Sequence, residues 1–266
     1  NAELNDPDYR TRHQIKTVRI PMVSILQPVR EPPDGIYEQQ EVVVATSTMS
    51  QQDWARMRVF AWITQVVYYS KALQIPMMLI HALQGVPYQQ LLWAFAEGPL
   101  PPGCEVLPQL RGFLQAQAGE ILAGRFEYTP GADPNSGEKI WMYPDSFATQ
   151  HLLYSPKLPA FFNEAAALLG PFATELPPGL LAESLAMSLA LFGSQHPARQ
   201  SFSLSLSWNL WDVYQQLLAG EPAELRREAW RFSRRQTATA YTITSELGSA
   251  QLSPSLDDEY STNLLL

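Results

Sequence analysis

The sequence predicts a mainly α-helical domain with a small antiparallel β-sheet, an α+β fold of helical-bundle character. Segments with apolar residues at three-and-four spacing recur along the 266 residues and are separated by proline and glycine. One stretch, Ser201 to Trp208, alternates strictly between apolar residues and serine. A hydrophobic content of 46% is enough to build a substantial core.

Residues 1 to 41 are predicted to form an extended arm that leaves a preceding domain. Prolines at positions 21, 28, 32 and 33 are spaced too closely for a helix, and only Thr17 to Ile20 has the character of a strand. The chain begins Asn1-Ala2 without a methionine, which suggests either residues left over from expression or a fragment cut from something longer.

The segment from Val42 to Lys71 is predicted to be the centre of the fold. It opens with the β-branched run Val42 to Val44, which suits a buried strand. Ser50 then begins a helix as its N-cap, in a capping box completed by Asp53. From Trp54 to Tyr69 the apolar residues cover nearly the whole helix circumference, which predicts a buried helix.

Arg58 and Gln65 occupy the main gap in that apolar surface. They lie seven residues apart and so on one helix face. Two readings stay open: a narrow solvent-exposed stripe, or a polar pair that lines a pocket or a domain interface. Trp54 could form part of a pocket wall, although large aromatics at helical spacing are more often core residues.

The middle of the chain is predicted to be helical apart from one hairpin. Residues 98 to 103, GPLPPG, form the clearest linker, and the turn-rich GADPNSGE separates two short strands. The predicted helices cover residues 77–83, 87–97, 105–123, 144–155, 157–170 and 177–193.

The last part of the chain is predicted to contain a strand, two helices and a second strand. Ser201 to Trp208 should turn leucines toward the core and serines toward solvent. A helix beginning at Glu221-Pro222 would place Arg227, Arg231 and Arg234 on one face. The default interpretation of this face is a solvated basic surface, followed by a docking site for an acidic partner domain and last by a nucleic-acid contact. Tyr241 to Ser245 is the second strand, and residues 248–266 are predicted to be a flexible tail.

The composition excludes several classes of function. A net charge of -8 argues against a general nucleic-acid binder, and no apolar run is long and continuous enough to span a membrane. One cysteine, Cys104, excludes a cysteine-ligated cluster, and the four histidines lack partners at metal-binding spacing. No glycine-rich phosphate loop or nucleophile elbow is present, so no catalytic, cofactor-binding or metal-binding residue is assigned. Without a signal peptide or a span, the expected location is the cytoplasm.

Two groups of residues resemble a known family. Thr48-Met49-Ser50-x-x-Asp53-Trp54, followed by Met57-Arg58-Val59-Phe60-x-Trp62, is similar to the C-terminal region of cobalamin-dependent radical S-adenosylmethionine enzymes. Tyr9-Arg10 and His13-x-Ile15-Lys16-Thr17-Val18 resemble the segment that leaves the radical domain in that family. The resemblance covers about the first hundred residues.

The resemblance implies an accessory role on the substrate side of a radical enzyme, for which a methyltransferase is one candidate. The partners implied are cobalamin-binding and radical domains upstream in the same protein, which would hold a 4Fe-4S cluster, S-adenosylmethionine and cobalamin. Residues 42–247 would form the accessory domain, which is expected to have no activity of its own and to bind none of these cofactors. The alternative is a free-standing helical protein-binding or scaffold module that uses the arginine-rich face.

Overall fold

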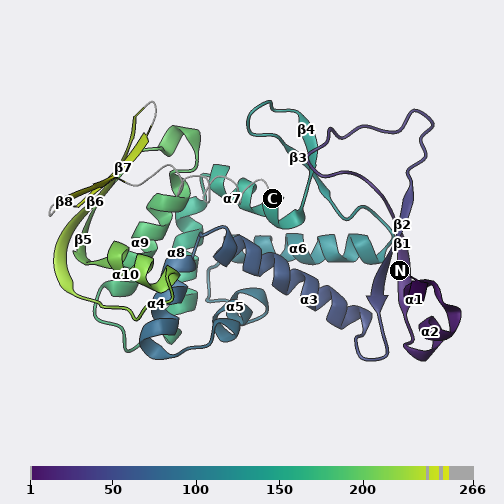
Figure 1. The fold of residues 1–266 in the computed structure, drawn as a ribbon, viewed down its shortest axis with the longest axis horizontal. Coiled ribbons are helices and arrows are strands. Elements are labelled where there is room, and N and C mark those ends of the chain that lie inside the picture. Colours follow the sequence, from purple (N-terminus) through teal and green to yellow (C-terminus); the bar gives the residue numbers. More distant parts are fainter. Residues whose placement is uncertain (1, 238–239, 246–247, 252–266) are drawn as a thin grey trace. The chain divides into compact units, whose positions relative to one another are not determined.

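The computed structural model describes residues 2–237, 240–245 and 248–251, and within them the fold is mainly helical with small antiparallel sheets, as predicted (Figure 1). The chain groups into two compact units, each made of two separate segments. Unit 1 comprises residues 1–63 and 109–148, and unit 2 comprises residues 64–108 and 149–266. The predicted division was a different one, an arm of residues 1–41 and one domain of residues 42–247.

The first 45 residues build two short helices and a hairpin in unit 1. The helices are α1 (Ala2–Asn5) and α2 (Pro7–Arg12), and the strands are β1 (Lys16–Pro21) and β2 (Gln39–Ala45). The prediction of an extended arm is therefore wrong for α1 and α2, where Asp6 caps α2 by accepting from the backbone N–H of Asp8. The predicted start of the domain at residue 42 falls inside β2.

A second hairpin completes the sheet structure of unit 1. Strands β3 (Thr129–Ala132) and β4 (Lys139–Met142) flank the predicted turn. The long β1–β2 connection runs beside β4, because the N–H of Leu26 donates to the carbonyl of Trp141 at 2.8 Å and the N–H of Val29 donates to that of Lys139 at 2.9 Å. These bonds satisfy backbone groups that a bare two-stranded hairpin would leave exposed.

Helix α3 (Gln51–Thr64) begins as predicted. The backbone N–H of Asp53 donates to the Ser50 hydroxyl at 3.1 Å, and the N–H of Ser50 donates to the Asp53 carboxylate at 3.4 Å, which is a reciprocal capping box. The prediction of burial on all sides is wrong, because Met57 is 54% exposed and Arg56 is also exposed.

The helix pattern changes at Gln65. Residues 65 to 69 form a π-helix, η1 (Gln65–Tyr69), which shifts the phase of the side chains that follow, so that Tyr69 is 57% exposed. Lys71, just beyond, adopts a positive φ of 66°. The α-helical spacing of 100° per residue, which was used to place Arg58 and Gln65 on one face, therefore holds only as far as residue 64.

The remaining helices agree with the predicted segments to within a few residues. The exception is the helix predicted from Glu221-Pro222, where the structure has a strand. Helix α4 ends at Gly85, whose φ of 67° suits glycine at this position. The helical elements are α4 (Gln74–Gln84), α5 (Tyr88–Ala96), α6 (Val106–Leu122), α7 (Pro144–Tyr154), α8 (Leu158–Leu169), η2 (Gly170–Phe172), α9 (Leu180–Gly193), η3 (Pro197–Arg199) and α10 (Leu210–Leu218).

Unit 2 holds a four-stranded antiparallel sheet in the order β5-β6-β7-β8. Its strands are β5 (Phe202–Trp208), β6 (Arg227–Thr237), β7 (Ala240–Ser245) and β8 (Gly248–Gln251). Figure 1 shows α9 and α10 beside β5 and β6, and residues from these elements share one core with α4. Leu206 and Phe232 are buried there, while Ser203, Ser205 and Ser207 are exposed, so the alternation predicted for β5 is confirmed.

The helix predicted from Glu221-Pro222 is wrong, because the chain forms β6 instead. Strand β6 pairs with β5 so that Leu204 lies opposite Phe232 and Ser205 opposite Arg231. Alternation in Ala229-Trp230-Arg231-Phe232 fits this strand, and pairing with β5 outweighs the helical propensity of the preceding residues. Of the predicted tail, residues 248–251 form β8 and residues 252–266 lie outside the described residues.

Candidate functional site

The guanidinium group of Arg58 lies between two tryptophans on α3. Trp54 and Trp62 are four residues before and after it, so all three side chains share one helix face. The guanidinium carbon lies 5.8 Å from the ring centroid of Trp54 and 5.3 Å from that of Trp62, within the range of cation–π attraction. Both indoles are buried, which keeps water from screening this attraction.

Glu127 is the charged partner of Arg58. The Arg58 Nη2 donates to the Glu127 carboxylate from 69 residues away in the sequence, and the two side chains are 33% and 18% exposed. The Nε of Arg58 is buried and has no hydrogen-bond partner among the described residues. One buried N–H of the guanidinium is therefore left without an acceptor in the described part of the chain.

Two phenols and a second carboxylate complete the cluster around Arg58. Tyr128 and Tyr143 meet edge to face, with ring centroids 5.2 Å apart, and Asp145 lies in the first turn of α7. Burial raises the pKa of Asp145, although the N–H of Ser146 and the charge of Arg58 act in the opposite direction. Burial also raises the pKa of Tyr128, with Tyr143 adding to that effect.

The electrostatics of this Arg58 cluster limit what it can bind. Burial lowers the pKa of Arg58, and the nearby Tyr128, Asp145 and Tyr143 partly offset that effect. One guanidinium faces the two carboxylates of Glu127 and Asp145, so the cluster carries no excess positive charge for an anion. Its chemistry is that of a polar recognition site with hydrogen-bond donors and aromatic walls, because it contains no activated nucleophile.

The other residues singled out from the sequence lie elsewhere. Gln65 is the first residue of η1 and belongs to unit 2, whereas Arg58 belongs to unit 1. Arg227 and Arg231 are exposed on β6. Trp230 and Phe232, on either side of Arg231 in the strand, face the opposite side of the sheet, where Trp230 is half-buried and Phe232 is buried. Arg234 lies on the same strand, where its backbone pairs with Phe202, so the three arginines do not lie on one helix face as predicted.

The sequence did not single out the partners of Arg58. Glu127, Tyr128, Tyr143 and Asp145 come from the β3–β4 region and the start of α7, and no local pattern links them to α3. Two signals were present: an acidic residue beside a tyrosine before the hairpin, and an aspartate directly after Pro144. Neither indicates which helix these side chains would meet.

The described residues contain no group of three or more histidine, cysteine, aspartate or glutamate side chains placed to hold a metal ion. Within the same part of the chain, no helix combines the length and the apolar character needed to cross a bilayer. Comparison with models of known protein families gives no match, and comparison with curated proteins gives none either.

Proposed function

We propose that this chain is an accessory region on the substrate side of a cobalamin-dependent radical S-adenosylmethionine enzyme. One observation carries the proposal: the stretch that resembles this family, Thr48 to Trp62, is the stretch that presents Arg58 between Trp54 and Trp62. A partly exposed guanidinium with aromatic walls suits contact with a polar substrate group.

The chemistry of the enzyme would come from domains upstream in the same protein. A 4Fe-4S cluster needs three or four thiolates, and the 266 residues contain one cysteine, so these residues do not fit the cluster. The role proposed for this chain is to orient a substrate and exclude water, with the cluster, S-adenosylmethionine and cobalamin held elsewhere. That the parent enzyme methylates its substrate is part of the same proposal.

Anaerobic reconstitution with iron and sulfide tests the division of labour. The 266-residue chain should bind no stoichiometric cluster, and the longer protein should bind one, as measured by visible absorbance and bound iron. A cluster on the 266-residue chain contradicts the ligand argument. Its absence from the longer protein contradicts membership of the family.

Two matched variants of the longer protein test the substrate-side role. Arg58→Met should lower substrate turnover at least tenfold while leaving the iron content unchanged. Arg56→Met, on the exposed side of the same helix, should leave both unchanged. Equal turnover in the two variants contradicts a role for Arg58 near the substrate.

The alternative role, a free-standing binding module, has lost the helical arginine face on which it depended. What remains in its favour is the exposed side of β5 and β6, where Arg231 lies opposite Ser205 and Arg227 lies further along β6. The reconstitution experiment separates the two roles, because a binding module requires no cluster in any longer form of the protein.

A further inference from the structure

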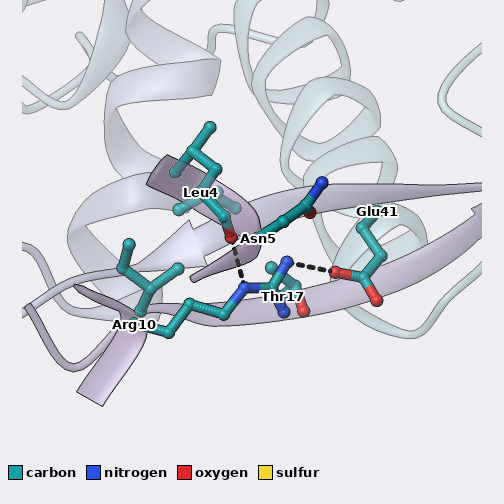
Figure 2. A pocket seen from close by; sticks show the side chains of 7 residues that line it. Leu4, Asn5, Arg10, Thr17 and Glu41 are labelled. Atoms are coloured by element: carbon teal, nitrogen blue, oxygen red, sulfur yellow. Dashed lines mark hydrogen bonds and ion pairs between the residues drawn. The ribbon is translucent and has the colours of Figure 1, made fainter. Parts of the chain in front are cut away.

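A pocket of about 240 Å³ lies on the β1–β2 hairpin beside α1 and α2, apart from the Arg58 cluster (Figure 2). Its wall combines three aliphatic side chains with two polar ones and an ion pair. The lining residues are Leu4, Asn5, Arg10, Ile15, Thr17, Glu41 and Val43.

The strand register explains why these hairpin residues share one face. Thr17 pairs with Val43 and Arg19 pairs with Glu41, and side chains two residues apart on a strand point the same way. The alternate residues Ile20 and Val44 are fully buried on the other face. The pocket therefore lies on the side of the hairpin that the core does not use.

Arg10 connects the helical side of the pocket to the strands. Its Nε donates to the carbonyl of Leu4, and its Nη2 donates to the Glu41 carboxylate at 2.8 Å (Figure 2). Arg19 approaches the same carboxylate at 3.5 Å. Hydrogen bonding to Arg10 lowers the pKa of Glu41, so this carboxylate is ionised at neutral pH.

Two guanidinium groups meet one carboxylate at this edge of the hairpin. Arg10 and Glu41 line the pocket and form an ion pair, and Arg19, which lies outside the lining, approaches the same carboxylate. Arg10 retains guanidinium N–H groups beyond those that reach Leu4 and Glu41, and Thr17 supplies a hydroxyl. Leu4, Ile15 and Val43 offer an apolar surface next to these donors.

We propose that this pocket binds a small aliphatic carboxylate. The ligand carboxylate accepts hydrogen bonds from Arg10 and Thr17, and its hydrocarbon chain packs against Leu4, Ile15 and Val43. Charge-assisted hydrogen bonds from the Arg10 guanidinium favour an anion over a neutral or cationic molecule of the same shape. This site is independent of the accessory function proposed for the Arg58 cluster.

Titration of the 266-residue chain with 4-methylpentanoate tests the proposal. Amide NMR signals of Thr17 and Val43 should shift saturably with a Kd in the millimolar range, as the size of the ligand allows. The uncharged alcohol 4-methylpentan-1-ol should bind at least tenfold more weakly. Equal binding of acid and alcohol overturns the charge argument, and an absence of saturable shifts overturns the site.

Variants locate the binding. Val43→Phe, which fills the pocket, should abolish the shifts, and Thr17→Val, which removes a hydroxyl at constant shape, should weaken binding at least threefold. Arg12→Gln is the matched control, because Arg12 is exposed on the same helix as Arg10 and does not line the pocket. Unchanged amide spectra elsewhere in each variant show that the fold is retained. Weakening by Arg12→Gln equal to that by Thr17→Val overturns the assignment.

Discussion

The carboxylate of Glu164 on α8 caps helix α6, because the backbone N–H of Val106 donates to its two oxygens at 2.9 and 3.1 Å. The N–H groups of Glu105 and Leu107 donate to the same carboxylate at 2.7 and 2.8 Å. A residue 58 positions away thus satisfies three backbone donors that have no partner within the helix.

Replacing Glu164 should therefore destabilise the protein. Glu164→Ala removes every acceptor and should lower the free energy of unfolding by about 1–2 kcal/mol, and Glu164→Gln should cost less because one oxygen remains. Urea denaturation measures the difference. The control is Glu105→Gln, whose exposed side chain forms a surface pair with Lys157 and should change stability by less than about 0.5 kcal/mol. Equal effects of Glu164→Ala and Glu105→Gln would contradict the cap.

The ion pair of Arg58 and Glu127 should be costly to break from one side. Arg58→Met leaves the poorly exposed Glu127 carboxylate without its counterion and should cost about 2 kcal/mol, less than a fully buried pair because Arg58 is partly exposed. The double variant Arg58→Met with Glu127→Leu should recover part of this loss. Urea denaturation of both variants and of the parent checks this. Losses that simply add would show that the two side chains are not coupled.

Asp145 should make stability depend on pH in the direction opposite to that of a carboxylate whose pKa is lowered by folding. Burial raises the pKa of Asp145 above the usual 3.8, so the folded state binds the proton of this carboxyl group more tightly than the unfolded state does. The folded state therefore loses stability as the pH rises from about 3.8 through the raised pKa. Asp145→Asn stays neutral and keeps an oxygen for the N–H of Ser146. Its stability relative to the parent should increase between about pH 4 and pH 7 in urea denaturation.

Asp133→Asn is the control for this pH effect. Backbone hydrogen bonds from Asn135 and Ser136 lower the pKa of Asp133, so its contribution is present above the usual pKa and is lost as the pH falls. The stability of Asp133→Asn relative to the parent should therefore decrease as the pH rises toward about 4 and stay nearly constant between about pH 4 and pH 7, where that of Asp145→Asn increases. The same slope for both variants would contradict the burial of Asp145.

Two glycine-to-alanine changes should have opposite signs. Gly112 lies within α6 with open space where a Cβ would stand, so Gly112→Ala should stabilise the protein by about 0.5–1 kcal/mol. A Cβ on Gly131 would stand 2.4 Å from the sulfur of Met142 and 3.1 Å from the ring of Phe147, so Gly131→Ala should cost about 1–3 kcal/mol. Thermal unfolding of both variants checks the signs, and a stabilising Gly131→Ala would show that the hairpin can adjust.

Local patterns predicted most of the elements and singled out Arg58 and Trp54, but not the other members of the candidate site. The capping box of Ser50 and Asp53 and the alternation in β5 depend on neighbours in the sequence, so they could be read directly. Strand β6 was missed because its leading residues favour a helix and only the pairing with β5 decides its form. The meeting of Arg58 with Glu127 depends on how α3 packs against a segment 69 residues later, which no periodicity encodes.

The interleaving of the two units constrains the order in which a ribosome can complete them. Unit 1 lacks α6 and the second hairpin until residue 148 has been synthesised, so its first 63 residues emerge without their packing partners. Residues 64–108 are made before unit 1 is finished, yet they belong to a core whose other half begins at residue 149. At about 5–20 residues per second, α4 and α5 wait for several seconds before α8 and α9 emerge. During that interval the apolar face of α4, with Ile75 and Leu79, is a candidate for chaperone binding on the nascent chain.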